Sequence, residues 1–313
     1  MSVKVFIDGS SGTTGLRIAD RLAQRPEIEL LSISAEGRKD VNERAKVINS
    51  ADLAFLCLPD AASKEVMPLL RPDVKVLDTS TAFRTDAAWD YGFPELKGQK
   101  AKIQNSYRVA VPGCYASGFI SIARPLVELG LAPADYPFSC TGISGYSGGG
   151  KKMIAEYESA DRPAHSKLDA PKSYGLGLAH KHLPEMQKIS GLAHTPMFVP
   201  VVCDYYCGMQ VLVPLDLTLA GSTAEQVAEG IAAYYKDAAT VKVHALNEAL
   251  PENGLYSNAM AGTDRMELYM TVNAAGDQMM LVSLFDNLGK GSSGAAVQCM
   301  NLMLGLEETK GLE

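Results

Sequence analysis

A glycine-rich turn between a short apolar strand and a helix constrains the fold of this chain more than any other feature. The run Val3 to Ile7 is typical of a strand, and Thr13 to Gln24 has the apolar spacing of a helix. Glycine lets the backbone approach a phosphate closely, and a helix N-terminus offers unpaired N–H groups. At a first strand-to-helix junction this favours a dinucleotide over an ordinary tight turn. The binding residues predicted here are Gly9, Ser11, Gly12, Thr13, Thr14 and Gly15.

The remainder of the first hundred residues continues the alternation of strands and helices. Apolar runs at 28–33, 52–58 and 74–77 are separated by helical spacing at 41–49 and 63–70. Continuous apolar strands of this kind indicate a parallel sheet that is covered on both faces. We therefore predict an α/β, doubly wound dinucleotide-binding (Rossmann) domain.

The pattern changes after Cys114, and a length of 313 residues suggests about two domains. A helix is predicted over 116–129, with Pro125 expected to kink or break it. Long β-rich runs follow at 138–143, 198–202 and 209–219, with a hairpin of 267–273 and 278–284. A helix over 223–236 begins with an expected capping box of Ser222 and Glu225, and a last helix covers 291–306. This order predicts a second domain of α+β type.

Charge and cysteine usage exclude several classes of protein. The net charge of −7 argues against a nucleic-acid or membrane-surface partner. The first nine residues resemble a strand and turn rather than a signal peptide, so a cytoplasmic enzyme is expected. Six cysteines are scattered along the chain, and the spacing of Cys203 and Cys207 matches no zinc ligand pair well. No metal site is predicted.

The end of the second strand indicates which dinucleotide is preferred. An NAD-binding protein often has an acidic residue there, whereas this chain has Ser34, followed by Arg38 and Lys39. A hydroxyl group with two nearby cations suits the 2′-phosphate of NADP(H). The alternative is a solvated basic loop that binds no ligand. Glu36 leaves this alternative open, because its carboxylate stands next to the two cations in the sequence.

Cys114 is the candidate nucleophile. It follows Pro112-Gly113 and stands at the start of a predicted helix, where the helix dipole and unpaired N–H groups lower the pKa of a thiol. The other five cysteines lie within or beside apolar runs and are expected to be inert. Position alone therefore favours a catalytic thiolate over a small buried side chain.

A thiolate nucleophile needs a group that handles protons, and two histidines precede a short predicted helix. His180 and His182 flank Lys181, and Glu185 follows in the first turn. Either histidine is suitable as a general acid or base, with Glu185 orienting it. A polar loop without chemistry is the alternative.

Two further segments are candidates for binding. Arg84 follows the carboxyl end of a predicted parallel strand, where ligands of such sheets bind, and its guanidinium suits a phosphate or carboxylate. The glycine-rich loop 144–151, which includes Gly145, follows a strand of the second domain. It allows close approach to cofactor or substrate, although a flexible connector is the alternative.

Several segments resemble, in the same order, the shorter form of the N-acetyl-γ-glutamyl-phosphate reductase family of arginine biosynthesis. They are Gly9 to Gly15, Asp78 to Arg84, Tyr91 to Leu96, Pro112 to Tyr115, His180 to Glu185 and Asp286 to Asn301. The resemblance spans nearly the whole chain. It implies a dinucleotide-binding domain of residues 1–113 and 287–313, interrupted by a catalytic domain of residues 114–286, as in the semialdehyde and glyceraldehyde-phosphate dehydrogenase group.

The resemblance also implies residue roles and a reaction. Cys114 is the implied nucleophile and His180 the base, with Glu185 nearby, His182 as a rival at the substrate, and Asn287 and Lys290 near the nicotinamide. The implied reaction is NADPH-dependent reductive dephosphorylation of N-acetyl-γ-glutamyl phosphate to the semialdehyde through a thioester, with release of inorganic phosphate. The family pattern usually has Asn before Pro-Gly-Cys, where this chain has Val111. A homodimer or homotetramer is expected.

Two alternatives stay open from the sequence. A related reductase acting on aspartyl phosphate or on carrier-linked aminoadipyl phosphate would use the same chemistry with a different pocket. A non-catalytic, NADP-sensing regulator would bind the dinucleotide but would not need Cys114.

Overall fold

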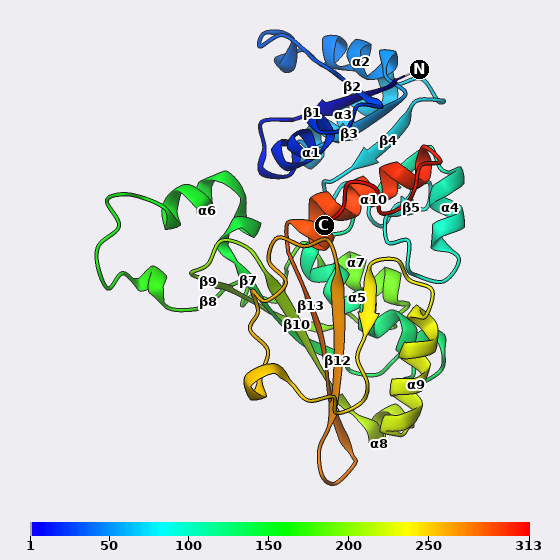
Figure 1. Ribbon diagram of the computed structural model, residues 1–313, viewed down its shortest axis with the longest axis vertical. Coiled ribbons are helices and arrows are strands. Elements are labelled where there is room, and N and C mark those ends of the chain that lie inside the picture. The colour runs from blue at the N-terminus through cyan, green and yellow to red at the C-terminus, as the bar shows by residue number, and fades with distance from the viewer. Residues whose placement is uncertain (1) are drawn as a thin grey trace. The chain divides into compact units, whose positions relative to one another are not determined.

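The computed structural model describes residues 2–313, except for the side chain of Glu252, and divides into two compact units (Figure 1). Met1 lies outside the described residues. The first unit comprises Met1–Gly113 and Ser292–Leu312, and the second comprises Cys114–Gly291 with Glu313. The boundary after Gly113 makes Cys114 the first residue of the second unit. Each unit has its own sheet.

The first unit contains a six-stranded sheet in the order β2-β1-β3-β4-β6-β5, in which every neighbouring pair is parallel. This order confirms the doubly wound class that the alternating pattern predicts. Its strands are β1 (Val3–Asp8), β2 (Ile28–Leu31), β3 (Leu53–Leu56), β4 (Lys75–Asp78), β5 (Asp90–Tyr91) and β6 (Arg108–Ala110). Its helices are α1 (Thr13–Ala23), α2 (Val41–Ser50), α3 (Asp60–Val66), α4 (Gln99–Asn105) and α10 (Gly294–Met303).

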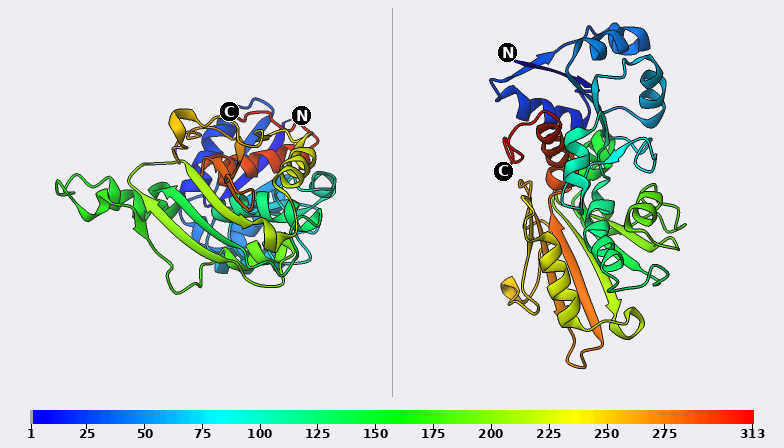
Figure 2. Two further views of the ribbon diagram at one scale, coloured as in Figure 1. Left: turned by 90° about the horizontal axis from the view of Figure 1, so that it is seen from below. Right: turned by 90° about the vertical axis from the view of Figure 1, so that its right-hand side faces the viewer.

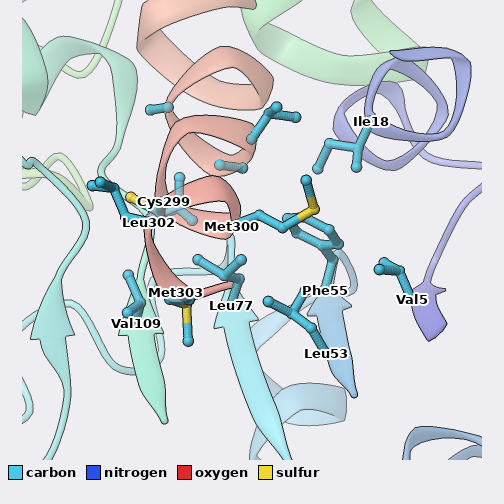
Figure 3. Close-up of a cluster of buried hydrophobic side chains, with 14 of the residues drawn as sticks. Val5, Ile18, Leu53, Phe55, Leu77, Val109, Cys299, Met300, Leu302 and Met303 are labelled. Carbon is cyan, nitrogen blue, oxygen red and sulfur yellow. The ribbon is translucent and has the colours of Figure 1, made fainter. Parts of the chain in front are cut away.

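Helices cover both faces of this sheet. On one face Ile18 of α1 and Met300 of α10 pack against strand residues such as Phe55 and Leu77 (Figure 3). On the other face Ile48 of α2 and Val66 of α3 belong to a second apolar cluster with strand residues. Because both sides of each strand are buried, the strands appear in the sequence as continuous apolar runs rather than as alternating ones.

The second unit contains a seven-stranded mixed sheet in the order β11-β12-β13-β10-β7-β9-β8. Its strands are β7 (Ser139–Gly145), β8 (Lys172–Ser173), β9 (Met197–Cys203), β10 (Met209–Asp216), β11 (Val241–Val243), β12 (Met266–Val272) and β13 (Gln278–Phe285). Its helices are α5 (Cys114–Glu128), α6 (Gly150–Tyr157), α7 (Leu183–Ser190), α8 (Leu217–Ala220) and α9 (Ala224–Tyr235). Helix α5 packs on β10 and β13, and both α7 and α9 pack against α5 (Figure 2). The α+β prediction and the β12–β13 hairpin are confirmed.

Pro125 was predicted to kink or break its helix, and a break is wrong. Helix α5 runs unbroken from Cys114 to Glu128. A proline lacks the N–H that would bond to the carbonyl four residues earlier, here that of Ser121. The hydroxyl of Tyr235, in α9, donates to this carbonyl at 2.8 Å instead. A tertiary contact therefore satisfies the group that the proline leaves without a donor.

Two local predictions need correction. The capping box of α9 uses Thr223 and Gln226 rather than Ser222 and Glu225, and the hydroxyl of Ser222 donates to the carbonyl of Leu131 instead. The run 209–219 is also not one strand, since β10 ends at Asp216, whose side chain caps the short helix α8. Among residues 2–313, no helix has both the length and the apolarity needed to cross a bilayer.

Candidate active site

The backbone segments of the glycine turn in the first unit pack so closely that two of its glycines leave no room for a side chain. Gly9 has a φ of +92°, and a Cβ there would lie 2.7 Å from the carbonyl oxygen of Cys57. A Cβ on Gly15 would lie 2.4 Å from the carbonyl oxygen of Gly9, which accepts from the Gly12 N–H at 2.9 Å. Helix α1 then begins at Thr13 with no side-chain cap on its N–H groups. A phosphate of a dinucleotide fits such a turn, because the N–H groups and the positive helix end complement its charge.

The other predicted residues of this region lie in and beyond the turn. Ser11 is exposed and Thr14 is half-buried, with its hydroxyl 3.1 Å from that of Ser292. The Ser34 hydroxyl accepts from the Gly37 N–H at 3.0 Å, which fixes the turn after β2.

Arg38 and Lys39 follow on the turn Gly37–Lys39, and both of these cations are exposed. Within the described residues, neither side chain has a hydrogen bond or an ion pair. Their charges are therefore available to an external anion. This exposure suits the binding of a ligand phosphate.

Arg84 is buried and holds main-chain groups together. Its Nε donates to the Val111 carbonyl at 2.9 Å, and Nη2 donates to the Thr79 carbonyl at 3.0 Å. Val111 in turn donates its N–H to the carbonyl of Asp78 at 2.8 Å, and its side chain belongs to the apolar core. Arg84 thus ties the loop after β4 to the segment that leads into Cys114. Burial raises the pKa of Asp78, whose carboxyl oxygens accept from two serine hydroxyls.

In the second unit, Cys114 is the first residue of α5 and is partly exposed. The backbone at Gly291 lies directly against it, since a Cβ on Gly291 would be 2.9 Å from the Cβ of Cys114. None of the six cysteines forms a disulfide. Burial raises the pKa of Cys57 to about 12, and it raises the pKa of Cys140 and Cys203 as well. Those three thiols are therefore poor nucleophiles at neutral pH.

An aromatic cluster forms beside Cys114 around the ring of His180. The His180 ring centroid lies 5.8 Å from that of Tyr115, 5.9 Å from Tyr174, 5.1 Å from Phe198 and 4.7 Å from His182. All four contacts are edge-to-face. The cluster brings residues from α5, β9 and the segment after β8 around one imidazole, and it limits the access of water to that ring.

The hydroxyls of the two tyrosines form a short chain. Tyr174 donates to the Tyr115 hydroxyl at 3.4 Å, and Tyr115 donates to the carbonyl of Val201 at 3.3 Å. Burial, with a smaller effect of Cys114, raises the pKa of Tyr174 to about 12. Both hydroxyls therefore stay protonated and neutral at physiological pH.

His180 has an unusual environment for a histidine in a loop. Its Nδ1 accepts a hydrogen bond from the backbone N–H of His182 at 3.2 Å. Burial, and secondarily the positive charge of Lys181, lowers the pKa of His180 to about 4. His182 is buried at the start of α7, and the carboxyl group of Glu185 is buried in the first turn of that helix.

Asn287 and Gly145, both predicted to bind the cofactor, lie at a crowded junction of loops. The Asn287 Oδ1 accepts from the Gly208 N–H at 2.9 Å, and its Nδ2 donates to the Ser147 hydroxyl at 3.0 Å. A Cβ on Gly145 would lie 2.6 Å from the carbonyl oxygen of Tyr205. The protein itself uses both ends of the Asn287 amide, so this side chain fixes the glycine-rich loop. Lys290 is buried.

Sequence reasoning missed Tyr115, Tyr174 and two glycines. Gly142 is needed because a Cβ there would lie 2.4 Å from the ring of Tyr115. Gly291 is needed because of its contact with Cys114. Tyr115 could have been found from its place after the candidate nucleophile, but nothing in the local sequence marks Tyr174 or Gly142. Among the described residues no group of histidine, cysteine, aspartate and glutamate side chains has an arrangement that could hold a metal ion.

Gly291→Ala should slow the chemistry of Cys114 without unfolding the second unit. The added methyl group would press on the Cys114 Cβ at 2.9 Å, and overpacking of this kind costs about 1–3 kcal/mol. We expect a drop of at least about tenfold in the alkylation rate of Cys114, measured by mass spectrometry. The control is Gly254→Ala, where a Cβ meets no atom within 4 Å. Equal alkylation rates in both variants would contradict a positioning role for Gly291.

The two units match two halves of one class of enzymes. Residues 4–104 match the family model of the semialdehyde dehydrogenase NAD-binding domain, and residues 114–287 match that of the semialdehyde dehydrogenase dimerisation domain. The structure of an aspartate semialdehyde dehydrogenase from Francisella tularensis is similar, with a TM-score of 0.71 over 96% of this chain and all of that one. At 14% identity this likeness shows the fold alone.

The sequences of known relatives show which family of semialdehyde dehydrogenases the chain belongs to. An N-acetyl-γ-glutamyl-phosphate reductase of Trichormus variabilis is 46% identical over 99% of both chains. Another, from Burkholderia cenocepacia, is 46% identical over 96% of this chain and 97% of its own length. The chain therefore belongs to the semialdehyde dehydrogenases and, within them, to the N-acetyl-γ-glutamyl-phosphate reductase family. The resemblance found from the sequence is confirmed, and the family makes the cofactor a nicotinamide dinucleotide.

Proposed function

We propose that this protein reduces N-acetyl-γ-glutamyl phosphate to N-acetylglutamate semialdehyde, with release of inorganic phosphate, as a step of arginine biosynthesis. Cys114 carries the proposal, because it combines a helix start, partial exposure and a neighbouring cluster of aromatic and histidine side chains. The names of relatives that align over nearly the whole chain supply the substrate. We further propose that the first unit binds the dinucleotide and that the second unit carries the catalysis.

In the proposed reaction the thiolate of Cys114 attacks the acyl carbon, and phosphate leaves with the electron pair of the C–O bond. The product is a thioester on Cys114, and covalent capture splits one difficult step into two. The dinucleotide, when bound, supplies a hydride to the thioester carbon. The C–S bond then breaks to return the thiolate and release the aldehyde. We propose His180 as the residue that transfers protons at the reacting group; the His182 ring lies 4.7 Å from its ring, and Glu185 lies in the first turn of α7.

We propose NADP(H) rather than NAD(H) as the cofactor. The glycine turn would hold the pyrophosphate, and Ser34, Arg38 and Lys39 would hold the 2′-phosphate. The exposure of both cations supports this, since neither has a partner within the described residues. Gly145 and Asn287 would act at the nicotinamide side by shaping the glycine-rich loop 144–151. Arg84 would act indirectly, by holding the segment that precedes Cys114.

Arg38→Ala combined with Lys39→Ala should raise the KM for NADPH by about 10–100-fold and leave the KM for NADH within about twofold, because only NADPH carries the extra phosphate. Steady-state kinetics with both cofactors measures this change. Lys46→Ala is the matched control, since Lys46 is an exposed cation on α2 that, among the described residues, forms one ion pair, at 3.7 Å with Glu43. An equal loss with both cofactors would contradict a 2′-phosphate site.

The second unit also supports a homo-oligomer, either a dimer or a tetramer. One face of its sheet is covered by α5, but the opposite face leaves apolar side chains partly exposed. Met197 is 58% exposed and Val199 is 36% exposed on β9. A groove on the same sheet is lined by Leu212, Leu250, Leu255, Tyr269, Met280 and Val282. A second copy that covers this face would bury the apolar surface. A cytoplasmic location stays a prediction.

The assay runs the reaction in reverse. Purified protein is mixed with NADP⁺, phosphate and N-acetylglutamate semialdehyde, and the appearance of NADPH is followed by absorbance. We expect NADPH formation that depends on phosphate. If aspartate semialdehyde reacts and N-acetylglutamate semialdehyde does not, the proposed chemistry stands and the proposed substrate is wrong. No reaction with any aldehyde, despite tight NADPH binding, would favour the sensor alternative.

A further inference from the structure

The glycine-rich loop 144–151 takes its position from the turn between β9 and β10, residues 204–208. Three successive N–H groups of the loop donate to carbonyl oxygens of this turn: Gly145 to Gly208 at 3.0 Å, Tyr146 to Tyr205 at 2.9 Å and Ser147 to Tyr206 at 3.0 Å. A Cβ on Gly145 would lie 2.6 Å from the carbonyl oxygens of both Tyr205 and Tyr206, so the two segments are in direct contact. Whatever holds the turn therefore also holds the loop.

Arg162 holds this turn from the excursion that carries α6, between β7 and β8 (Figure 1). Its Nη1 donates to Oδ1 of Asp204 at 2.9 Å, and its Nη2 donates to Oδ2 of the same carboxylate. The pair is bidentate, and this geometry gives an arginine–carboxylate contact both strength and a fixed direction. The hydrogen bonds from Arg162 lower the pKa of Asp204, so its carboxylate stays ionised at neutral pH. Arg162 therefore holds the turn in one defined position.

The guanidinium group is also fixed within its own segment. Nη1 donates to the carbonyl of Tyr157, the last residue of α6, at 3.1 Å, and Nη2 donates to Asp169. Only 18% of the Arg162 side chain is exposed, and its guanidinium carbon lies 5.8 Å from the centre of the Tyr157 ring. Isolated ion pairs on an exposed surface contribute little, whereas this pair belongs to a largely covered network.

Aromatic rings join the same three segments. The ring of Tyr146, in the loop, stacks on Tyr157 of α6, with centroids 4.7 Å apart and an angle of 16° between the ring planes. It also meets the ring of Tyr206, in the turn, edge-to-face at 5.8 Å. The loop, the turn and the end of α6 therefore form one packed cluster, in which Arg162 ties the turn to α6 by polar contacts.

We propose that Arg162 is a positioning residue for the dinucleotide: by holding Asp204 it fixes the turn 204–208, and through that turn it orders the backbone of the glycine-rich loop before NADPH binds. The inference rests on the proposed function, in which this loop acts at the nicotinamide side. A loop that is already ordered loses less conformational entropy when its ligand binds, so the affinity is higher. Arg162 acts through Asp204 and is not a catalytic residue.

The first test measures the order of the loop without any ligand. Amide hydrogen exchange is followed by mass spectrometry in peptides that cover residues 144–149, in the wild type and in Arg162→Gln. We expect exchange at least about tenfold faster in the variant, because these amides exchange through local opening.

The matched control for this test is Asp169→Asn. It removes another carboxylate from Arg162 but leaves the pair with Asp204 in place, so we expect exchange within about twofold of wild type. Unchanged exchange in Arg162→Gln would overturn the proposal. Equal increases in both variants would overturn it as well, because Arg162 would then serve the excursion rather than the loop.

The second test asks which part of the cofactor is affected. Isothermal titration compares NADPH with adenosine 2′,5′-bisphosphate, a ligand that has the 2′-phosphate but no nicotinamide. We expect Arg162→Gln to raise the Kd for NADPH about tenfold or more and to leave the Kd for the bisphosphate within about twofold. A merely structural role of Arg162 would weaken the binding of both ligands or of neither, and either result would overturn the proposal.

A double variant tests whether Arg162 acts through Asp204. We expect Asp204→Asn to weaken NADPH binding as Arg162→Gln does, and the double variant to bind within about twofold of either single variant, because both changes break the same contact. Losses that multiply would show independent effects and overturn the proposal. If the wild type binds NADPH but reduces no acyl phosphate, the proposed function fails, while the exchange and binding results still decide the role of Arg162.

Discussion

Cys114→Ser is expected to lower phosphate-dependent NADPH formation by about 10⁴-fold or more while NADPH still binds. A serine hydroxyl is almost fully protonated at neutral pH and is a much weaker nucleophile than a thiolate, so covalent capture of the acyl group is lost. The dinucleotide turn belongs to the other unit, at Gly9 to Gly15, and keeps its geometry. Absorbance assays measure the rate of NADPH formation, and fluorescence titration measures NADPH binding.

The control for this variant is Cys203→Ser. Burial raises the pKa of Cys203, so its thiol is not expected to react. Activity of Cys203→Ser within about twofold of wild type would separate the effect of one nucleophile from the general loss of a sulfur atom. If Cys114→Ser retained a tenth of the wild-type rate, a covalent mechanism through Cys114 would be excluded.

Two substitutions in the glycine turn should separate binding from folding. Gly12→Ala should weaken NADPH binding by about 100-fold with little change in Tm, because its nearest neighbour would be 3.4 Å away and its φ of −73° suits alanine. The methyl group would instead occupy the space of the ligand. Gly15→Ala should weaken binding and also lower Tm by roughly 3–10 °C, since its Cβ would lie 2.4 Å from the carbonyl oxygen of Gly9.

Isothermal titration with NADPH and thermal unfolding measure the two effects, with Gly254→Ala as the control in the second unit. Unchanged NADPH affinity in Gly12→Ala would mean that no phosphate approaches the turn. A large fall in Tm for Gly12→Ala would instead mean that this glycine serves the fold alone. The two variants thus test different parts of the same turn.

The sequence by itself determined the features that depend on neighbouring residues. The run from Val3 to Gly15 specifies a strand, a tight turn and a helix because glycine spacing and apolar periodicity are local properties. Alternating strands and helices specified the doubly wound sheet, and Pro112-Gly113 specified a helix beginning at Cys114. The order of the family motifs also specified the class of enzyme, which the relatives confirm.

Only the tertiary structure decided the features that depend on groups far apart in the sequence. Pro125 remains within α5 because Tyr235 of another helix donates to the carbonyl that the proline leaves without a donor. The amide of Asn287 is held by Gly208 and Ser147, and Nε of Arg84 is held by the carbonyl of Val111, 27 residues further along the chain. No window of the sequence contains these pairs, so no local pattern predicts them.

The histidines show the same division most clearly. The sequence placed His180 and His182 in one loop and left open which of them acts and how. The charge of an imidazole depends on burial and on the groups that face it, and those groups come from α5, β9 and the segment after β8. Folding brings them around His180 and lowers its pKa, whereas in the unfolded chain both rings would be equally solvated. The types of chemical group are therefore encoded locally, but their protonation states are set by the packing.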